Sequence, residues 1–455
     1  MAELEKTVTL GRGIVLAILM VIGSGLLGLP GLVADVGTVQ EVVFGWLLII
    51  LAAMPLIQIC AMLGKKFPYS GGLFHYSREA VGEWGGYAVT ALVCGSFSLG
   101  IPAVALIGGE YLQHLFDFSG LGVHLLAFVV ITAMTLITTA GVRLVSFFNY
   151  AAVVVLLFLI VALTFYNFNF FSSGLEVSIQ ALYEGLSAGI SGIVGLNSEI
   201  SGFSGSFYIS SSSYLYPDPY NLWKISALLF WAFLGWENMS FGLGELQNPE
   251  KNVQRVFWLS FGIVIFIYLM LAVTSIGADA AGIPLSGASG LVELVKFTPP
   301  GNLLIWLMAV VIIANVTCWN FASSRLLYAL GKEKVLPAYL GKLSKHGQPM
   351  ASILSMYTAF VLVLMGTYLF KVPVSSLLML VNQNFLFLYG FILLSYWKTE
   401  KGWRRWIYSG LSLLSLSFLI SGFTWRVLYS VALIGIGYYG FVRKSTKSRE
   451  ICEIS

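Results

Sequence analysis

The sequence is poor in charged residues. Only 10% of its 455 residues are Asp, Glu, Lys or Arg, whereas 58% are hydrophobic and the mean hydropathy is +0.86. A water-soluble protein of this length needs a far more charged surface. The shortage excludes a soluble fold and predicts an all-α chain that crosses a membrane many times.

Residues for catalysis and metal binding are also scarce. The chain has four cysteines and four histidines, and they form no CxxC, HExxH or comparable ligand spacing. We therefore expect no metal site, no cofactor and no enzymatic activity. The net charge of +4 needs no nucleic-acid partner, because the membrane topology described next accounts for it.

Long apolar runs occupy most of the chain. Since about 20 apolar residues cross a bilayer, the runs predict a single membrane domain, residues 1–442. Residues 169–220, rich in Ser and Gly, form the one long connection, which we expect to be a solvated extracellular lid, and residues 443–455 form a tail. The twelve predicted spans are 12–34, 41–64, 86–115, 123–140, 143–168, 221–245, 256–278, 301–330, 350–370, 374–397, 403–422 and 424–442.

The basic residues concentrate in every second loop of this map. If the N-terminus is cytoplasmic, all but four of the 25 Lys and Arg residues fall in cytoplasmic loops or at cytoplasmic span ends, the exceptions being Lys224, Lys296, Lys371 and Arg426. Positive charge is retained on the cytoplasmic side during insertion. The pattern predicts a multi-pass protein of the cell membrane with both termini in the cytoplasm.

Two spans are interrupted at their centres. The first carries Gly23-Ser24-Gly25, and the sixth carries Gly235, Glu237 and Asn238. The breaks lie five spans apart, an odd number, so a second five-helix unit would enter the membrane inverted relative to the first. Paired breaks in two inverted halves indicate the binding site of a secondary transporter, because unwound backbone is tolerated in a membrane only where it faces a cavity or a ligand.

These halves are residues 12–168 and 221–397, and residues 403–442 add two accessory helices. The first break can present N–H groups to a carboxylate at the positive end of a half-helix. The second can present carbonyl groups to an ammonium group. Together they predict a receptor for the zwitterionic part of an amino acid. The alternative is that the glycines only let helices pack closely.

Three segments resemble the signature segments of the amino acid–polyamine–organocation (APC) superfamily. They are GSGLLGLP in the first span, FWAFLGWENMSFGLGELQNPEKNV in the sixth and SSRLLYALGKEKVLPAYLGKLSKHGQP at the exit of the eighth. The resemblance extends over nearly the whole chain and implies a LeuT-like 5+5 inverted repeat with two additional C-terminal helices. Within the superfamily, the chain is similar to bacterial exporters of methionine and branched-chain amino acids.

The resemblance also implies a binding site. Amides around Ser24 would bind the substrate carboxylate, nearby carbonyls would bind the amino group, Trp231 would act as an outer gate, and Asn382 would close the site through a hydrogen bond. The implied substrate-binding residues are Val21, Gly23, Ser24, Gly25, Trp231, Leu234, Trp319 and Asn382. The implied gating and coupling residues are Phe233, Gly235, Glu237, Ser323 and Ser324.

Several of these residues have a second interpretation. Asn382 could bond to a neighbouring helix, Glu237 could be a structural acceptor rather than a proton-linked gate, and Ser323 and Ser324 could be small packing residues rather than sodium ligands. No charged pair lines the predicted pocket, which favours a neutral, apolar amino acid moved by exchange or with protons, with export as a candidate direction. The alternatives are a sodium-coupled symporter and an amino-acid sensor without transport. The sequence does not determine the oligomeric state.

Overall fold

The computed structural model describes residues 8–68, 72–116, 122–194, 217–241, 243, 246–296, 298–332, 334–345, 347–421 and 424–454. Its regular elements are helices, and within these residues the only strand-type pairing recorded is the isolated parallel bridge between Val8 and Leu246. That bridge joins the start of the chain to the segment that follows the sixth predicted span. The all-α prediction is therefore confirmed.

The first half of the chain forms eight helices. They are α1 Leu10–Val21, α2 Ser24–Ala34, α3 Val39–Lys66, α4 Gly72–Val81, α5 Glu83–Gln113, α6 Gly122–Ala140, α7 Val142–Tyr166 and α8 Phe168–Val194. The second half contains two short 3-10 helices, η1 and η2. Its elements are α9 Pro219–Leu229, η1 Phe230–Phe233, η2 Asn238–Phe241, α10 Pro249–Ala280, α11 Val292–Val295, α12 Gly301–Lys332, α13 Met350–Leu369, α14 Val374–Thr399, α15 Trp403–Ile420 and α16 Val427–Ile454.

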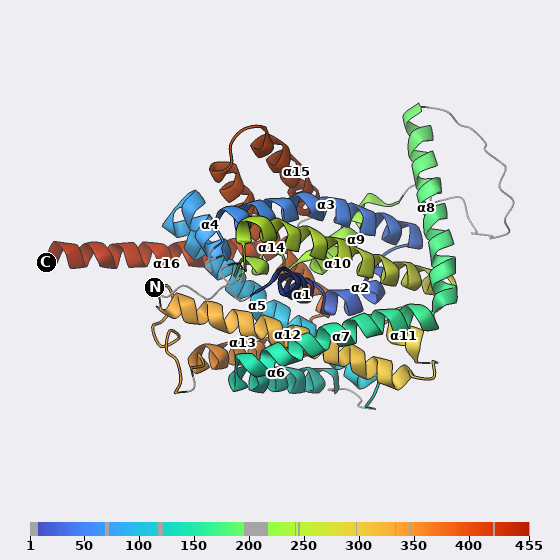
Figure 1. The fold of residues 1–455 in the computed structure, drawn as a ribbon, viewed down its shortest axis with the longest axis horizontal. Coiled ribbons are helices and arrows are strands. Elements are labelled where there is room, and N and C mark those ends of the chain that lie inside the picture. The colour runs from blue at the N-terminus through green and yellow to red at the C-terminus, as the bar shows by residue number, and fades with distance from the viewer. Residues whose placement is uncertain are drawn as a thin grey trace.

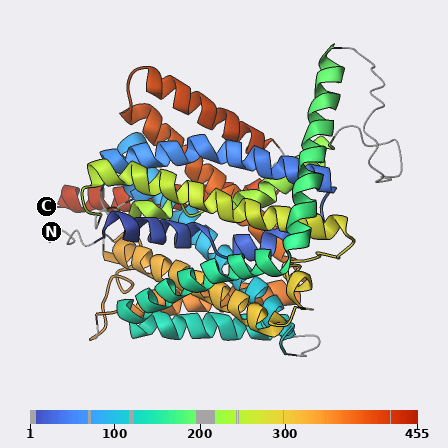
Figure 2. The ribbon, with the colours of Figure 1, turned by 45° about the vertical axis from the view of Figure 1, so that its right-hand side comes forward.

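The long helices run side by side, and the start of α1 and the end of α16 lie at the same end of the bundle (Figures 1 and 2). We call this the terminal end and the opposite one the distal end. In the described part of the chain, nine helical segments are long and apolar enough to span a membrane. The α1–α2 segment is one of them, and the others belong to α3, α5, α6, α7, α10, α12, α13 and α14.

The three remaining predicted spans coincide with helices that do not meet this length and hydropathy criterion. Span 221–245 is the interrupted segment from α9 to η2, span 403–422 is α15, and span 424–442 lies within α16. The structure thus confirms a multi-pass helical protein, whereas the count of twelve spans stays a prediction.

Large apolar side chains line the outside of the bundle. On α7, Phe147, Val154 and Val161 are each exposed by more than two thirds. An apolar stripe of this size would be a liability in water, but it is what a lipid-facing helix requires. The fold therefore agrees with the shortage of charge in the sequence.

Helix ends are held by caps that also join helices. Thr38 and Glu41 form a capping box at the start of α3. The second carboxylate oxygen of Glu41 accepts a hydrogen bond from the backbone N–H of Asp218 at 2.9 Å, and Asp218 in turn caps α9. These bonds place the distal start of the sixth predicted span beside α3.

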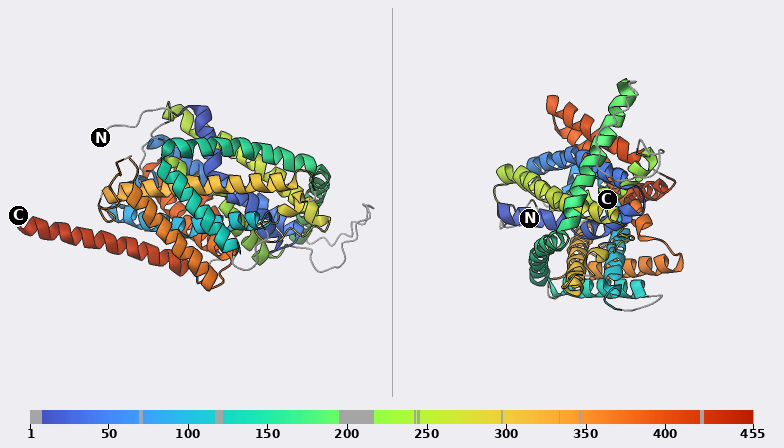
Figure 3. Two further views of the ribbon diagram at one scale, coloured as in Figure 1. Left: turned by 90° about the horizontal axis from the view of Figure 1, so that it is seen from below. Right: turned by 90° about the vertical axis from the view of Figure 1, so that its right-hand side faces the viewer.

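The segment 169–220, expected to be a solvated lid, begins with a long helix. Its first part is the helix α8, which lies across the distal ends of the long helices and packs against α10 and α3 (Figures 1 and 3). Residues 195–216 lie outside the described part of the chain. Most of the predicted tail is helical, because α16 continues as one helix from the last span to Ile454 and projects from the terminal end (Figure 1).

Candidate functional site

The first span is broken at Ile22 and Gly23. Helix α1 ends at Val21, Ile22 is extended with φ −81° and ψ 122°, and α2 begins at Ser24 with Gly23 as its N-terminal cap. A Cβ on Gly23 would lie 2.0 Å from Cγ of Asn315 on α12, so any side chain there would require the Asn315 amide to move. The first amides of a helix have no acceptor within it; in α2 these are the amides of Ser24 and Gly25 at the predicted break, whereas the Leu26 N–H donates to the Gly23 carbonyl at 3.2 Å.

The sixth span is broken over a longer stretch. Helix α9 tightens into η1, Leu234 is extended with φ −83° and ψ 149°, and Gly235 has φ +117°. This left-handed backbone favours glycine, since a side chain there would be strained. The chain resumes helical turns only at Asn238.

The two breaks touch each other. A Cβ on Gly235 would lie 2.3 Å from the carbonyl oxygen of Met20, and a Cβ on Gly25 would lie 3.2 Å from Cα of Ala232. Main chain therefore meets main chain between the last turn of α1, the first turn of α2 and the sixth-span break. The predicted substrate-binding residues Val21, Gly23, Gly25, Trp231 and Leu234 belong to this contact region. For Ser24 the structure describes the backbone position only.

Aromatic rings enclose the contact on the α5 and α12 side. Trp231 stacks on Trp319, with ring centroids 5.9 Å apart and planes inclined by 26°. Phe97 and Phe385 meet Trp319 edge-on, at 5.7 Å and 6.2 Å between centroids. Trp231 and Trp319, predicted from distant parts of the sequence, are thus neighbours in the structure.

Glu237 is a buried acceptor at the sixth-span break. Its carboxylate oxygens accept the backbone N–H of Gly235 at 2.9 and 3.1 Å, and one of them accepts the Tyr389 hydroxyl at 2.9 Å. Only 2% of the residue is exposed. The carboxylate therefore holds the shape of the break and joins it to α14, which is the structural role that the sequence left open beside gating.

Two predicted residues lie near the break without facing its backbone. Phe233 packs against Phe261 and Tyr268 of α10. Asn382 donates its amide N–H to the carbonyl of Ala227 on α9 at 2.7 Å. Asn382 thus makes the helix-to-helix bond that was the alternative to closing the substrate site.

The serine pair of α12 is turned toward its own helix. Ser323 donates to the carbonyl of Asn320 at 2.9 Å, and Ser324 donates to the carbonyl of Phe321 at 2.8 Å. Both residues are fully buried. This geometry is typical of serines that pack inside a membrane helix. Within the described residues, no group of three or more His, Cys, Asp or Glu side chains could hold a metal ion.

Tyr268 and Asn315 are two site residues that the sequence did not reveal. The Tyr268 hydroxyl lies 3.4 Å from the position of a Cβ on Gly25. It is buried and has no hydrogen-bond partner among the described residues. Both residues stand in uninterrupted helices, where a single Tyr or Asn reads as ordinary packing, so the linear sequence carries no signal for them.

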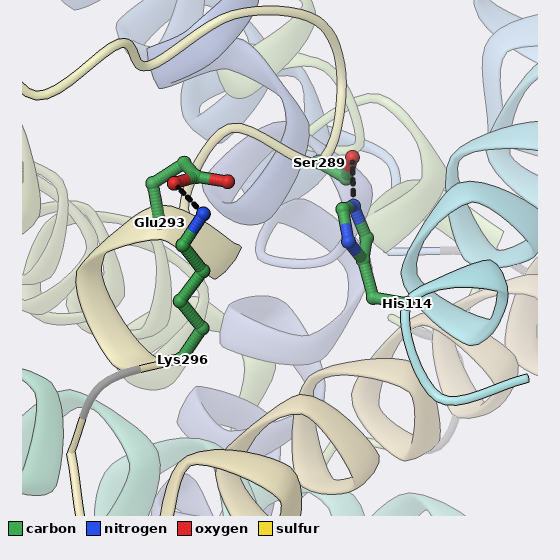
Figure 4. Close-up of polar contacts among 4 residues, drawn as sticks. All are labelled: His114, Ser289, Glu293 and Lys296. Atoms are coloured by element: carbon green, nitrogen blue, oxygen red, sulfur yellow. Dashed lines mark hydrogen bonds and ion pairs between the residues drawn. The ribbon is translucent and has the colours of Figure 1, made fainter. Parts of the chain in front are cut away.

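Residues 281–291 pack against the distal half of α2. The backbone N–H of Gly287 donates to the Asp35 carboxylate at the end of α2, at 2.9 Å. Figure 4 shows His114 at the end of α5 against Ser289, with Nε2 and Oγ 3.0 Å apart, and the Glu293–Lys296 ion pair beside them.

The fold and the paired breaks define an integral membrane protein organised around two interrupted helices. The sequence model of the amino acid permease family matches residues 13–448, and the chain belongs to that family, within the APC superfamily. It is therefore a multi-pass amino acid transporter of the cell membrane and not an enzyme.

Three relatives illustrate the range of the match. The chain is 24% identical to the uncharacterized amino acid permease YecA of Bacillus subtilis strain 168, over 99% of this chain and 98% of that protein. It is 21% identical to the L-methionine/branched-chain amino acid exporter YjeH of Escherichia coli K12, over 95% and 96% of the two chains. It is 26% identical to the gamma-aminobutyric acid permease of the same organism, over 78% and 72%.

Proposed function

We propose that the protein moves neutral, apolar L-amino acids by alternating access, through exchange or with protons, and that export is its direction. The observation that carries this proposal is the contact between the two breaks, which brings the start of a half-helix and an unwound carbonyl segment together. Such an arrangement suits a carboxylate and an ammonium group on one small molecule. The similarity to an exporter of methionine and branched-chain amino acids supports an apolar side chain.

The surroundings of the contact favour a neutral substrate. The ring faces and edges of Trp231, Trp319, Phe97 and Phe385 offer shape and apolar surface. The carboxylate of Glu237 is directed to Gly235 and Tyr389. Sites of this kind select ligands by fit, with few polar groups fixing the orientation.

The proposal includes the twelve-span topology of a LeuT-like 5+5 inverted repeat with both termini in the cytoplasm. In this orientation the terminal end is the cytoplasmic face and the distal end is the outer face. The four basic residues expected outside, Lys224, Lys296, Lys371 and Arg426, stand at distal helix ends or loops. The hydroxyl groups of Ser323 and Ser324 both donate to carbonyls of their own helix, and sodium-coupled symport is the alternative that the flux measurements below distinguish.

Flux measurements test this function directly. We expect purified protein in liposomes to exchange labelled methionine or leucine, and we expect competition by apolar amino acids to exceed that by lysine or glutamate. Trp231→Ala should lower the apparent affinity about tenfold or more, equal to 1.4 kcal/mol or more. The control Trp425→Ala, whose side chain is 78% exposed at the distal end, should change it little.

Two results would contradict the proposed activity, and a third would contradict the assigned site. Substrate-dependent stabilisation of the protein without any flux would indicate a sensor, and flux that requires sodium would indicate a symporter. Equal losses in the Trp231 and Trp425 variants would remove the assigned site even if transport were observed.

A further inference from the structure

Helix α8 carries an exposed apolar stripe. Phe168, Leu175, Ile179 and Leu186 are exposed by 61%, 45%, 59% and 60%. Their spacing places them on one side of the helix. Isolated exposed apolar residues are ordinary, but a continuous stripe along a whole helix calls for a partner.

A polar stripe runs beside the apolar one. Asn169, Glu176, Gln180 and Glu184 are all exposed, and the side-chain amide of Gln180 donates to the Glu184 carboxylate at 2.9 Å. The third side of the helix, which includes Gly174, packs on the bundle. Thus α8 has three faces, one toward protein, one apolar and one acidic.

Contacts with α3 indicate which exposed face points toward the membrane interior. The Gln40 amide donates to the carbonyl of Ala181 and lies 3.4 Å from the Cβ position of Gly185. Gly185 in addition meets the Phe44 ring at 2.5 Å, one turn farther from the distal end of α3. With 3.6 residues per turn, Gly185 borders the apolar stripe and Ala181 borders the polar one. The apolar stripe therefore lies on the deeper side and the acidic stripe on the outward side.

Helix α8 packs on α10 with main chain against main chain. A Cβ on Gly277 would lie 1.9 Å from the carbonyl oxygen of Phe170, and a Cβ on Gly174 would lie 1.9 Å from the carbonyl oxygen of Val273 and 2.8 Å from the backbone nitrogen of Gly277. This close contact fixes α8 against the distal part of α10.

We propose that α8 is an amphipathic arm that lies flat in the headgroup region of the bilayer at the distal end, with the lipid surface as its binding partner. The helix stands across the long helices in every view and reaches laterally past α3 (Figures 1 and 3). Its apolar stripe also continues the lipid-facing surface of α7, where Val161 and Phe165 are 69% and 73% exposed. An amphipathic helix in the plane of the interface is an established mode of membrane association.

Charge identifies the kind of lipid that suits the arm. Interfacial helices commonly carry Lys and Arg that attract anionic lipids. Here no Lys or Arg occurs between residues 144 and 223, and the outward stripe carries Glu176 and Glu184. The arm therefore binds through apolar burial, and zwitterionic headgroups suit it better than anionic ones.

Spin-label accessibility tests the proposal on the full-length protein in phosphatidylcholine liposomes. Single cysteines replace Leu175, Ile179, Glu176 and Gln180 in turn, in a variant that lacks the four native cysteines. We expect labels at 175 and 179 to collide preferentially with oxygen, which partitions into lipid. Labels at 176 and 180 should collide preferentially with a water-soluble nickel chelate, so the ratio of the two collision rates should reverse between the pairs.

Three outcomes would overturn the proposal. Nickel access at all four positions would show a solvated lid. Labels at 175 and 179 that neither reagent reaches, with strong spin–spin coupling between copies, would show a second copy of the chain on this face. A requirement for anionic lipid would contradict the charge argument.

A matched pair of substitutions keeps the test independent of the substrate site. Ile179→Glu places a charge on the deeper face, so the label at 175 should become accessible to the nickel chelate. Gln180→Glu adds the same charge on the outward face and should leave that label in lipid. Amino acid exchange measured in the same liposomes reports on the proposed function separately, because neither residue lies near the paired breaks.

Discussion

At the scale of single residues, we expect the Tyr268 hydroxyl to contribute to substrate binding but not to the stability of the fold. It is buried beside Gly25 and has no partner among the described residues. A buried polar group without a partner costs about 1–3 kcal/mol. A substrate carboxylate at the first break would be within reach of this hydroxyl and would supply the hydrogen-bond partner that it lacks among the described residues.

Tyr268→Phe should therefore weaken transport without weakening the fold. We expect the apparent substrate affinity to fall about tenfold, the upper range for one hydrogen bond, and the melting temperature of the substrate-free protein to stay equal or rise. The control Tyr111→Phe removes a formed bond to the Leu27 carbonyl, 2.8 Å long, so its melting temperature should fall. Loss of stability in the Tyr268 variant would refute the assignment.

Glu237 gives a second prediction at this scale. Its carboxylate accepts from both Gly235 and Tyr389, and a neutral amide would offer one acceptor oxygen fewer. Glu237→Gln should thus slow flux at every pH because the break is held less firmly. If Glu237 also carries the coupled proton, the variant should lose the pH dependence of flux. A wild-type rate and pH profile would exclude both roles.

At the scale of elements, the breaks depend on glycines that backbone contacts make irreplaceable. Gly235→Ala puts a side chain at φ +117° and 2.3 Å from the Met20 carbonyl oxygen. We expect a loss of about 1–3 kcal/mol from backbone strain alone and the loss of transport. Gly262→Ala in α10, where nothing lies within 4 Å of the new Cβ, should be neutral or mildly stabilising. Thermal unfolding and flux of the two variants check this.

Elements also show which parts of the fold could be predicted from the sequence. The two breaks were predictable because glycine and glutamate inside an apolar run are a compositional signal. Helix α8 was not, since its Ser and Gly content reads as a loop, and it is helical where it packs on α10 and α3. Tyr268 and Asn315 were not predictable either, because only the folded arrangement brings them to Gly25 and Gly23.

At the scale of the whole molecule, the proposed orientation has a direct test. Single cysteines at Lys371, in the distal loop between α13 and α14, and at Lys342, in the terminal loop between α12 and α13, should differ in intact cells. A membrane-impermeant maleimide should label position 371 without lysis and position 342 only after it. The reverse pattern would invert the topology and with it the positive-inside argument.

The contact between Gly235 and the Met20 carbonyl also governs how the molecule can move. No side chain lies between the two interrupted helices at this contact. Under the proposed alternating-access cycle, a tilt of either helix would be transmitted to the other through main-chain atoms, so that opening one side of the pathway would be coupled to closing the other. A carrier with this contact would resist leakage even without substrate.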